Sequence, residues 1–127
     1  LSNGYTMQII GQPPTYGSHT LDTPLAPTPS TPGVEQFGIN LVANTTPEVG
    51  DDPVQVPSDE MSFGEVAEGY RTANLFQYSS GSMVAFSSTE SGRTDYTLSM
   101  IVNVAGSTPA GHYVGDFSAV VIPVFLL

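Results

Sequence analysis

The sequence predicts an all-β protein, and within that class an immunoglobulin-like or jelly-roll-like β-sandwich. Apolar and polar residues alternate with a period of two in several segments, and no window shows a helical apolar stripe. Turn residues recur about every 8–12 residues, a spacing typical of sandwiches built from short strands. With 127 residues, the chain is long enough for one domain with a sizeable core.

The first expected strand covers residues 1–12, where Tyr5, Met7 and Ile9 would share one face. Residues 13–33 follow and contain six of the eleven prolines. Proline cannot donate a hydrogen bond to a sheet and favours extended conformations, so this segment is expected to be a semi-rigid tether. The sandwich body would then span residues 34–127.

The body is expected to contain six strands, separated by turns and by a polar loop at residues 44–60. Seven strands are the usual minimum for an immunoglobulin-like sandwich. The N-terminal segment could supply the missing strand to its own domain or to a neighbouring subunit, and the sequence leaves both alternatives open. The six expected strands are residues 34–43, 61–66, 73–79, 82–88, 94–105 and 112–125.

The final strand is apolar on both faces, whereas a half-buried strand would alternate. The strand is therefore expected to be either central in its sheet or covered by another chain, because an exposed edge of this composition invites aggregation. If residues 1–12 insert into a neighbour, head-to-tail exchange does not close and generates a filament. The expected donor residues are Tyr5, Met7, Ile9 and Ile10, and the expected acceptor groove contains Val120, Ile122, Val124 and Phe125.

The composition argues against several function classes. Twelve acidic residues stand against two arginines, giving a formal net charge of −10, so binding to nucleic acids or anionic lipids is not expected. The chain has no cysteine for disulfides, thiolate chemistry or zinc. Its most apolar stretch, residues 119–127, is too short for a membrane-spanning helix, which needs about 20 residues. His19 and His112 have no ligand-spaced partner and are expected to be exposed, and we expect no enzymatic activity.

Two loop features suggest a ligand or a modification. Seven of the twelve acids fall between residues 48 and 68, and carboxylate oxygens suit Ca²⁺, although the spacing matches no EF-hand. The candidate calcium ligands are Asp51, Asp52, Asp59 and Glu60, and the alternative is a solvated acidic loop without any cofactor. Asn44 begins an N-x-T sequon in the same loop, so it is a candidate glycosylation site.

Residues 107–117 read STPAGHYVGDF, a turn that links an alternating strand to the terminal strand. This run is similar to the C-terminal hairpin of spore coat protein U-like and archaic chaperone–usher pilin subunits. The segments FGINL (37–41), NTTP (44–47) and TDYT (94–97) also resemble bacterial surface proteins of similar size. The resemblance implies an immunoglobulin-like, exported subunit that polymerises by donor-strand exchange.

The function expected from the sequence is therefore that of a structural subunit of an extracellular, pilus-like bacterial filament, with copies of itself as partners. Because the chain begins at Leu1 without methionine, we expect a mature product from which a signal peptide has been removed. Two alternatives share the sandwich architecture: a monomeric adhesin or carbohydrate-binding surface module, and a viral capsid or decoration protein.

Overall fold

The computed structural model describes residues 2–58 and 60–125, and this part of the chain is all-β. It contains one 3₁₀ turn, η1 (Glu68–Tyr70), and no helix that is long or apolar enough to cross a membrane. The strands are β1 (Ser2–Tyr16), β2 (His19–Thr20), β3 (Thr28–Pro29), β4 (Gln36–Asn40), β5 (Val54–Val56), β6 (Glu65–Val66), β7 (Leu75–Phe76), β8 (Met83–Ser87), β9 (Arg93–Asp95), β10 (Ser99–Asn103) and β11 (Val114–Phe125).

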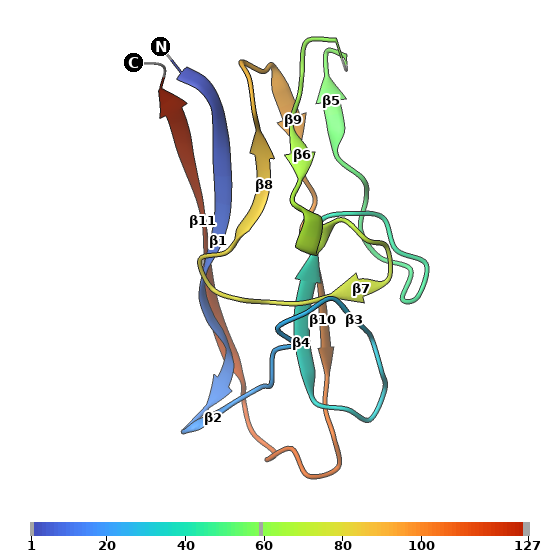
Figure 1. The fold of residues 1–127 in the computed structure, drawn as a ribbon. Coiled ribbons are helices and arrows are strands. Elements are labelled where there is room, and N and C mark those ends of the chain that lie inside the picture. Colours follow the sequence, from blue (N-terminus) through green and yellow to red (C-terminus); the bar gives the residue numbers. More distant parts are fainter. Residues whose placement is uncertain (1, 59, 126–127) are drawn as a thin grey trace.

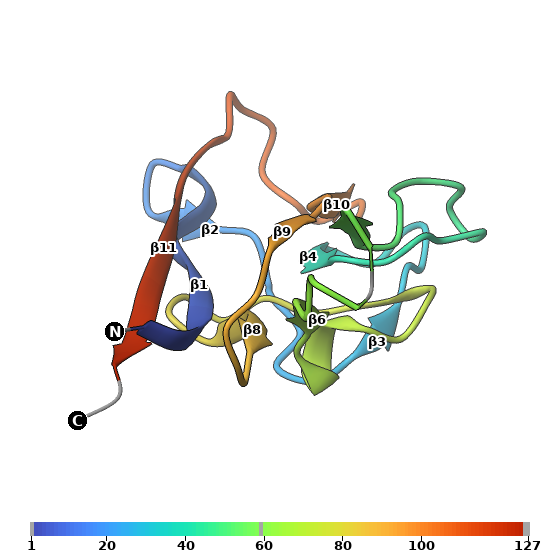
Figure 2. The same ribbon diagram turned by 90° about the horizontal axis from the view of Figure 1, so that it is seen from above.

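The largest sheet has the strand order β11-β1-β8-β6, with β2 paired to the end of β1. The first and last strands of the chain therefore lie side by side, and Figure 1 shows them as a long blue and red ribbon at the left. Three further antiparallel pairs complete the fold: β10 with β4, β3 with β7, and β5 with β9. Viewed from above, the β1–β11 ribbon forms one side of the molecule, and β4 and β10 lie nearer its middle (Figure 2).

The core lies where β4, β7, β8 and the segment before β8 meet. Phe37, Tyr78 and Phe117 form an aromatic cluster within it: the Phe37 and Phe117 rings are stacked 5.3 Å apart, and the Tyr78 ring meets Phe117 edge-on at 5.6 Å. This cluster is the main link between β11 and the core. The buried apolar residues around it include Ile9, Leu21, Ile39, Leu41, Val66, Tyr70, Val84 and Ala85.

The all-β prediction is confirmed, but the expected strands are shorter and more divided. The segment expected as one strand over 94–105 forms β9 and β10, because β9 pairs with β5 while β10 pairs with β4. The loop expected over 44–60 contains β5, and the strand expected over 61–66 is reduced to β6. A change of pairing partner breaks a strand even where its alternating pattern continues.

The segment expected as a tether is attached to the body along much of its length. Pro13 and Pro14 lie inside β1, and β3 pairs with β7. Leu21 is buried, with 3 % of its surface exposed, and the Tyr78 N–H donates to the Pro24 carbonyl at 3.2 Å. The first connection after β1 is therefore the tight turn to β2, and not a long tether.

Candidate assembly interface

The strands that carry the expected donor and acceptor residues pair with each other in one chain, but none of the expected donors lies opposite an expected acceptor. The β1–β11 register is continuous from Tyr5, opposite Pro123, to Gln12, opposite Asp116. Within it, Ile9 lies opposite Ala119 and Ile10 lies opposite Ser118. The other pairs are Thr6 with Ile122, Met7 with Val121 and Gln8 with Val120, while Phe125 lies opposite Ser2 beyond an irregularity.

The inner face of the ribbon carries the three alternating residues that the sequence placed together. Ile9 is in the core, with 6 % of its surface exposed. Tyr5 and Met7 line a cavity of about 260 Å³ with Val121, and the Tyr5 hydroxyl lies 2.7 Å from the Tyr96 hydroxyl. Burial, followed by the hydrogen bond to Tyr5, raises the pKa of Tyr96, so this phenol stays neutral.

The final strand is far more exposed than its composition predicts. Val114, Val121, Ile122, Val124 and Phe125 all expose between 45 % and 63 % of their surface. The strand pairs with β1 on one side only, because it stands at the edge of its sheet. Apolar residues on an uncovered edge strand are a recognised site of strand pairing with another chain.

Three hydrogen bonds fix the direction of the main-chain groups of β1. The Gly81 N–H donates to the Ile9 carbonyl at 2.9 Å, and the Gly11 N–H donates to Ser80 Oγ at 3.0 Å. The Tyr78 hydroxyl donates to the Gly11 carbonyl. All three partners precede β8, on the side of β1 away from β11. Odd-numbered residues of β1 therefore direct their peptide groups away from β11, and even-numbered residues direct theirs toward it.

The register determines in the same way which peptide groups of β11 point toward β1. From Thr6 to Gln12, even-numbered residues of β1 pair with even-numbered residues of β11, so those are the residues of β11 that hydrogen-bond to β1. The odd-numbered residues then present their N–H and C=O groups on the free edge. These are Gly115, Phe117, Ala119, Val121 and Phe125, together with Pro123, which has no N–H to present.

The ribbon is almost free of charge, although the chain as a whole is strongly acidic. Residues 2–16 and 114–125 contain one ionisable charge, Asp116, whereas the full chain has twelve acidic residues and two arginines. Six of the seven acids between residues 48 and 68 lie in the described part of the chain, on segments outside β1 and β11. The apolar ribbon and the acidic loop are thus separate regions of the molecule.

A polar cluster ties the segment after β1 to the body. His19 Nε2 lies 2.7 Å from Glu35 Oε1, and the Thr108 hydroxyl donates to the same oxygen at 2.9 Å. The Asp22 N–H donates to the other carboxylate oxygen at 3.1 Å. The hydrogen bond from His19 holds the pKa of Glu35 below its ordinary value. The expectation that His19 is a free polar residue missed this pair, whose partners are sixteen residues apart.

The candidate calcium ligands do not form a site in the described part of the chain. Asp52 accepts a hydrogen bond from the Ala43 N–H at 2.9 Å, so one of its oxygens closes the loop. No group of three acidic or histidine side chains gathers anywhere within residues 2–58 and 60–125. Asp59, the fourth candidate beside Asp51 and Glu60, lies outside the described residues.

Asn44 is not the exposed loop residue that the sequon suggested. Only 5 % of its surface is exposed, and its amide donates to Asn40 Oδ1 and to the carbonyls of Val42 and Val49. Its Oδ1 accepts from the amide of Asn40 and from the Asn74 N–H. A side chain bonded in this way is a structural element of the loop and has no free amide for a glycan.

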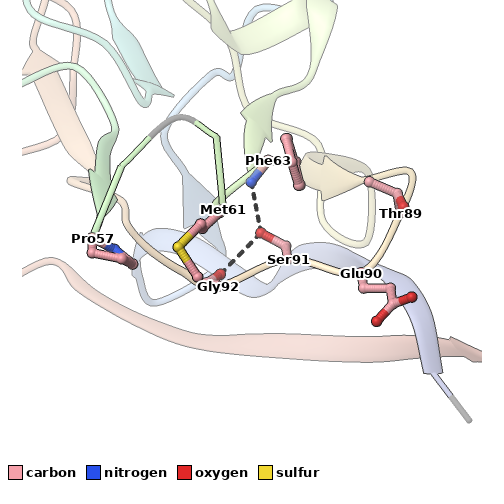
Figure 3. Close-up of a pocket in the computed structure, with 7 residues that line it drawn as sticks. All are labelled: Pro57, Met61, Phe63, Thr89, Glu90, Ser91 and Gly92. Atoms are coloured by element: carbon pink, nitrogen blue, oxygen red, sulfur yellow. Dashed lines mark hydrogen bonds between the residues drawn. The ribbon is translucent and has the colours of Figure 1, made fainter.

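A shallow hollow with a volume of about 470 Å³ lies beside β9 (Figure 3). Phe63 and Met61 are exposed at its rim. The Ser91 hydroxyl accepts from the Phe63 N–H at 2.7 Å and donates to the Gly92 carbonyl at 2.9 Å. Both hydrogen bonds of this hydroxyl are therefore made within the surrounding loops.

Comparison with known proteins gives no match to a family model, to a curated protein or to a solved structure.

Proposed function

We propose that this protein is a structural subunit of an extracellular bacterial filament, in which β1 of one copy inserts into the next copy. Each subunit would be an immunoglobulin-like or jelly-roll-like sandwich, completed by a neighbour's strand. The observation that carries the proposal is the position of β1: it is N-terminal, uncharged and central between β11 and β8.

Exchange would preserve the contacts that β1 makes within one chain. A neighbour's β1 would pair with β11 and β8 in the same register, so the two states differ mainly in the connection after β1. That connection is a two-residue turn, Gly17-Ser18, with Gly17 at a φ of 60°. If the turn opens, β1 leaves the body, while the His19–Glu35 pair keeps β2 in place at the start of the body.

The balance between the two states depends on concentration. Pairing within the chain benefits from an effective concentration of about millimolar order, so trans pairing requires high subunit concentration or a strained turn. Because each copy both donates and accepts one strand, exchange continues from subunit to subunit. The resulting polymer would be held by main-chain hydrogen bonds and by the inner-face residues Tyr5, Met7 and Ile9.

The double variant Gln8→Cys/Val120→Cys tests the proposal, since these residues are opposed in the register and the chain has no other cysteine. An antiparallel pair places their Cα atoms about 5 Å apart, which a disulfide can bridge. After refolding at high concentration and oxidation, a non-reducing gel should show a ladder that collapses on reduction. At high dilution the same variant should give an internally crosslinked monomer.

Each single-cysteine variant is the matched control, because it can form dimers at most. Negative-stain microscopy of the concentrated wild-type protein should show filaments. A double variant that gives only the crosslinked monomer at every concentration would overturn strand exchange.

A further inference from the structure

The free edge of β11 is a second surface that strand exchange does not use. Whether β1 comes from the same chain or from a neighbour, β11 has a partner on one side only. Its odd-numbered residues present main-chain groups outward, and several of its side chains are exposed and apolar. The edge also lacks lysine and arginine, which commonly prevent such strands from pairing.

The charge distribution favours a second copy of this chain as the occupant. Two copies with a net charge of −10 repel each other, so their contact must lie where the charge density is lowest. The β1–β11 ribbon is that region, with Asp116 as its one charge. A basic partner would instead be drawn to the acidic loop, away from this edge.

We propose that β11 pairs antiparallel with β11 of a second copy, about a two-fold axis at Ser118. This register pairs Phe117 with Ala119 and Gly115 with Val121 of the partner, in both directions. Four of the five outward residues that have an N–H are then used, giving about eight main-chain hydrogen bonds. Shifting the axis to Ala119 would place Gly115 opposite Pro123, which cannot donate.

The side chains agree with the same register. The even-numbered residues form the non-hydrogen-bonded pairs, in which side chains approach most closely. Val114, 62 % exposed, would lie opposite Ile122 of the other copy, 45 % exposed, so both become covered. Asp116 would lie opposite Val120, which keeps the two carboxylates apart, whereas an axis at Asp116 would place them face to face.

The product is a closed dimer with a sheet that is continuous through both copies. An interface of one strand pair is small, so we expect reversible association rather than an obligate dimer. Within a filament formed by exchange, the same edge would join two filaments laterally. The dimer does not require strand exchange, so each of the two proposals can fail without the other.

The test uses opposite charges at the axis. Ser118 is exposed, so Ser118→Asp and Ser118→Lys are compatible with the fold, yet each places like charges face to face in the dimer. Sedimentation should show that each variant alone self-associates at least about tenfold more weakly than the wild type. An equimolar mixture of the two variants should form a heterodimer and recover the wild-type affinity. Loss of self-association in one variant without recovery in the mixture would contradict pairing at this axis.

Ser88→Asp and Ser88→Lys are the matched controls, since Ser88 is exposed after β8 and away from this edge. They should leave the association unchanged. Ser118→Cys should form a disulfide-linked dimer on oxidation and no higher species, unlike the ladder expected for strand exchange. A wild-type protein that remains monomeric at about 1 mM, or Ser118 variants that dimerise normally, would overturn the proposal.

Discussion

The side chain of Asn44 shows how one residue can determine the structure of a loop. It exchanges hydrogen bonds with Asn40 and accepts one from the Asn74 N–H, thereby joining β4 to the turn before β7. Asn74 in turn accepts from the N–H groups of Thr45 and Thr46. Asn74 has a φ of 68°, a left-handed conformation that asparagine tolerates better than most residues.

We predict that Asn44→Ala destabilises the protein by about 2–4 kcal/mol, because it leaves buried donors and acceptors without partners. Urea denaturation monitored by tyrosine fluorescence would measure the change in the free energy of unfolding. Thr46→Ala is the control in the same turn: Thr46 is exposed and its N–H contact with Asn74 is retained, so the change should stay within about 0.5 kcal/mol. Equal effects of the two variants would contradict a structural role for the Asn44 side chain.

At the level of elements, the attachment of β11 to the body depends on few side chains. The strand pairs with β1 along its length, but its strongest link to the core is Phe117, which packs against Phe37 and Tyr78. Close approach of the two strands also requires Gly11, which has a φ of 150° and would, with a Cβ, collide with the Asp116 carbonyl. Apart from its main-chain pairing with β1, β11 is thus held mainly by one aromatic anchor and one close backbone contact.

We predict that Phe117→Ala costs about 2–3 kcal/mol, near the lower end for such truncations because the ring is half-buried. Hydrogen exchange should accelerate in residues 114–125 and residues 2–16 more than in β4 and β10. Phe125→Ala in the same strand is the matched control. Phe125 is 63 % exposed, so its truncation should change stability by less than about 0.5 kcal/mol. Uniform acceleration across all strands would argue against a separate ribbon.

At the scale of the whole molecule, a net charge of −10 opposes every form of self-association. The repulsion between copies is screened by salt, since the Debye length falls from about 20 Å or more at millimolar ionic strength to about 10 Å at 0.1 M. The apolar ribbon contributes an attraction that salt does not weaken. Self-association should therefore strengthen as the ionic strength rises.

We predict that self-association of the wild-type protein strengthens several-fold between about 20 mM and 300 mM NaCl, as measured by sedimentation velocity. CaCl₂ at equal ionic strength should act as NaCl does, because the described acids form no cluster of three. A much larger effect of CaCl₂, reversed by EDTA and absent with MgCl₂, would contradict this prediction. It would indicate a calcium site in the acidic loop. Association that weakens as salt rises would contradict the role assigned to the uncharged ribbon.

The alternation of residues along single segments was readable in advance because it is a local property. Tyr5, Met7 and Ile9 could be placed on one face since a strand directs successive side chains to opposite sides. The apolar character of both faces of the final strand was also visible, but it was interpreted as a sign that the strand is central in its sheet or covered by another chain. The structure covers one edge of β11 and leaves both its faces and its other edge largely exposed.

Other features had no local signal. The His19–Glu35–Thr108 cluster joins residues from three separate segments, so no spacing in the sequence indicates it. The sequon at Asn44 suggested exposure, whereas the amide is buried by neighbours that arrive from residues 40 and 74. The division of residues 94–105 into two strands likewise depends on which partner each half meets.

The sequence by itself therefore determined the all-β class, the uncharged N-terminal strand, the C-terminal strand with its single charge, and the concentration of acids between residues 48 and 68, because these follow from composition and period-two patterning. Tertiary structure alone decided that β1 and β11 pair with each other, which of their peptide groups are satisfied, and where Pro123 falls on the free edge. The physical reason is that a strand's faces are set by its own residues. Its partner and register are set instead by contacts between segments more than a hundred residues apart.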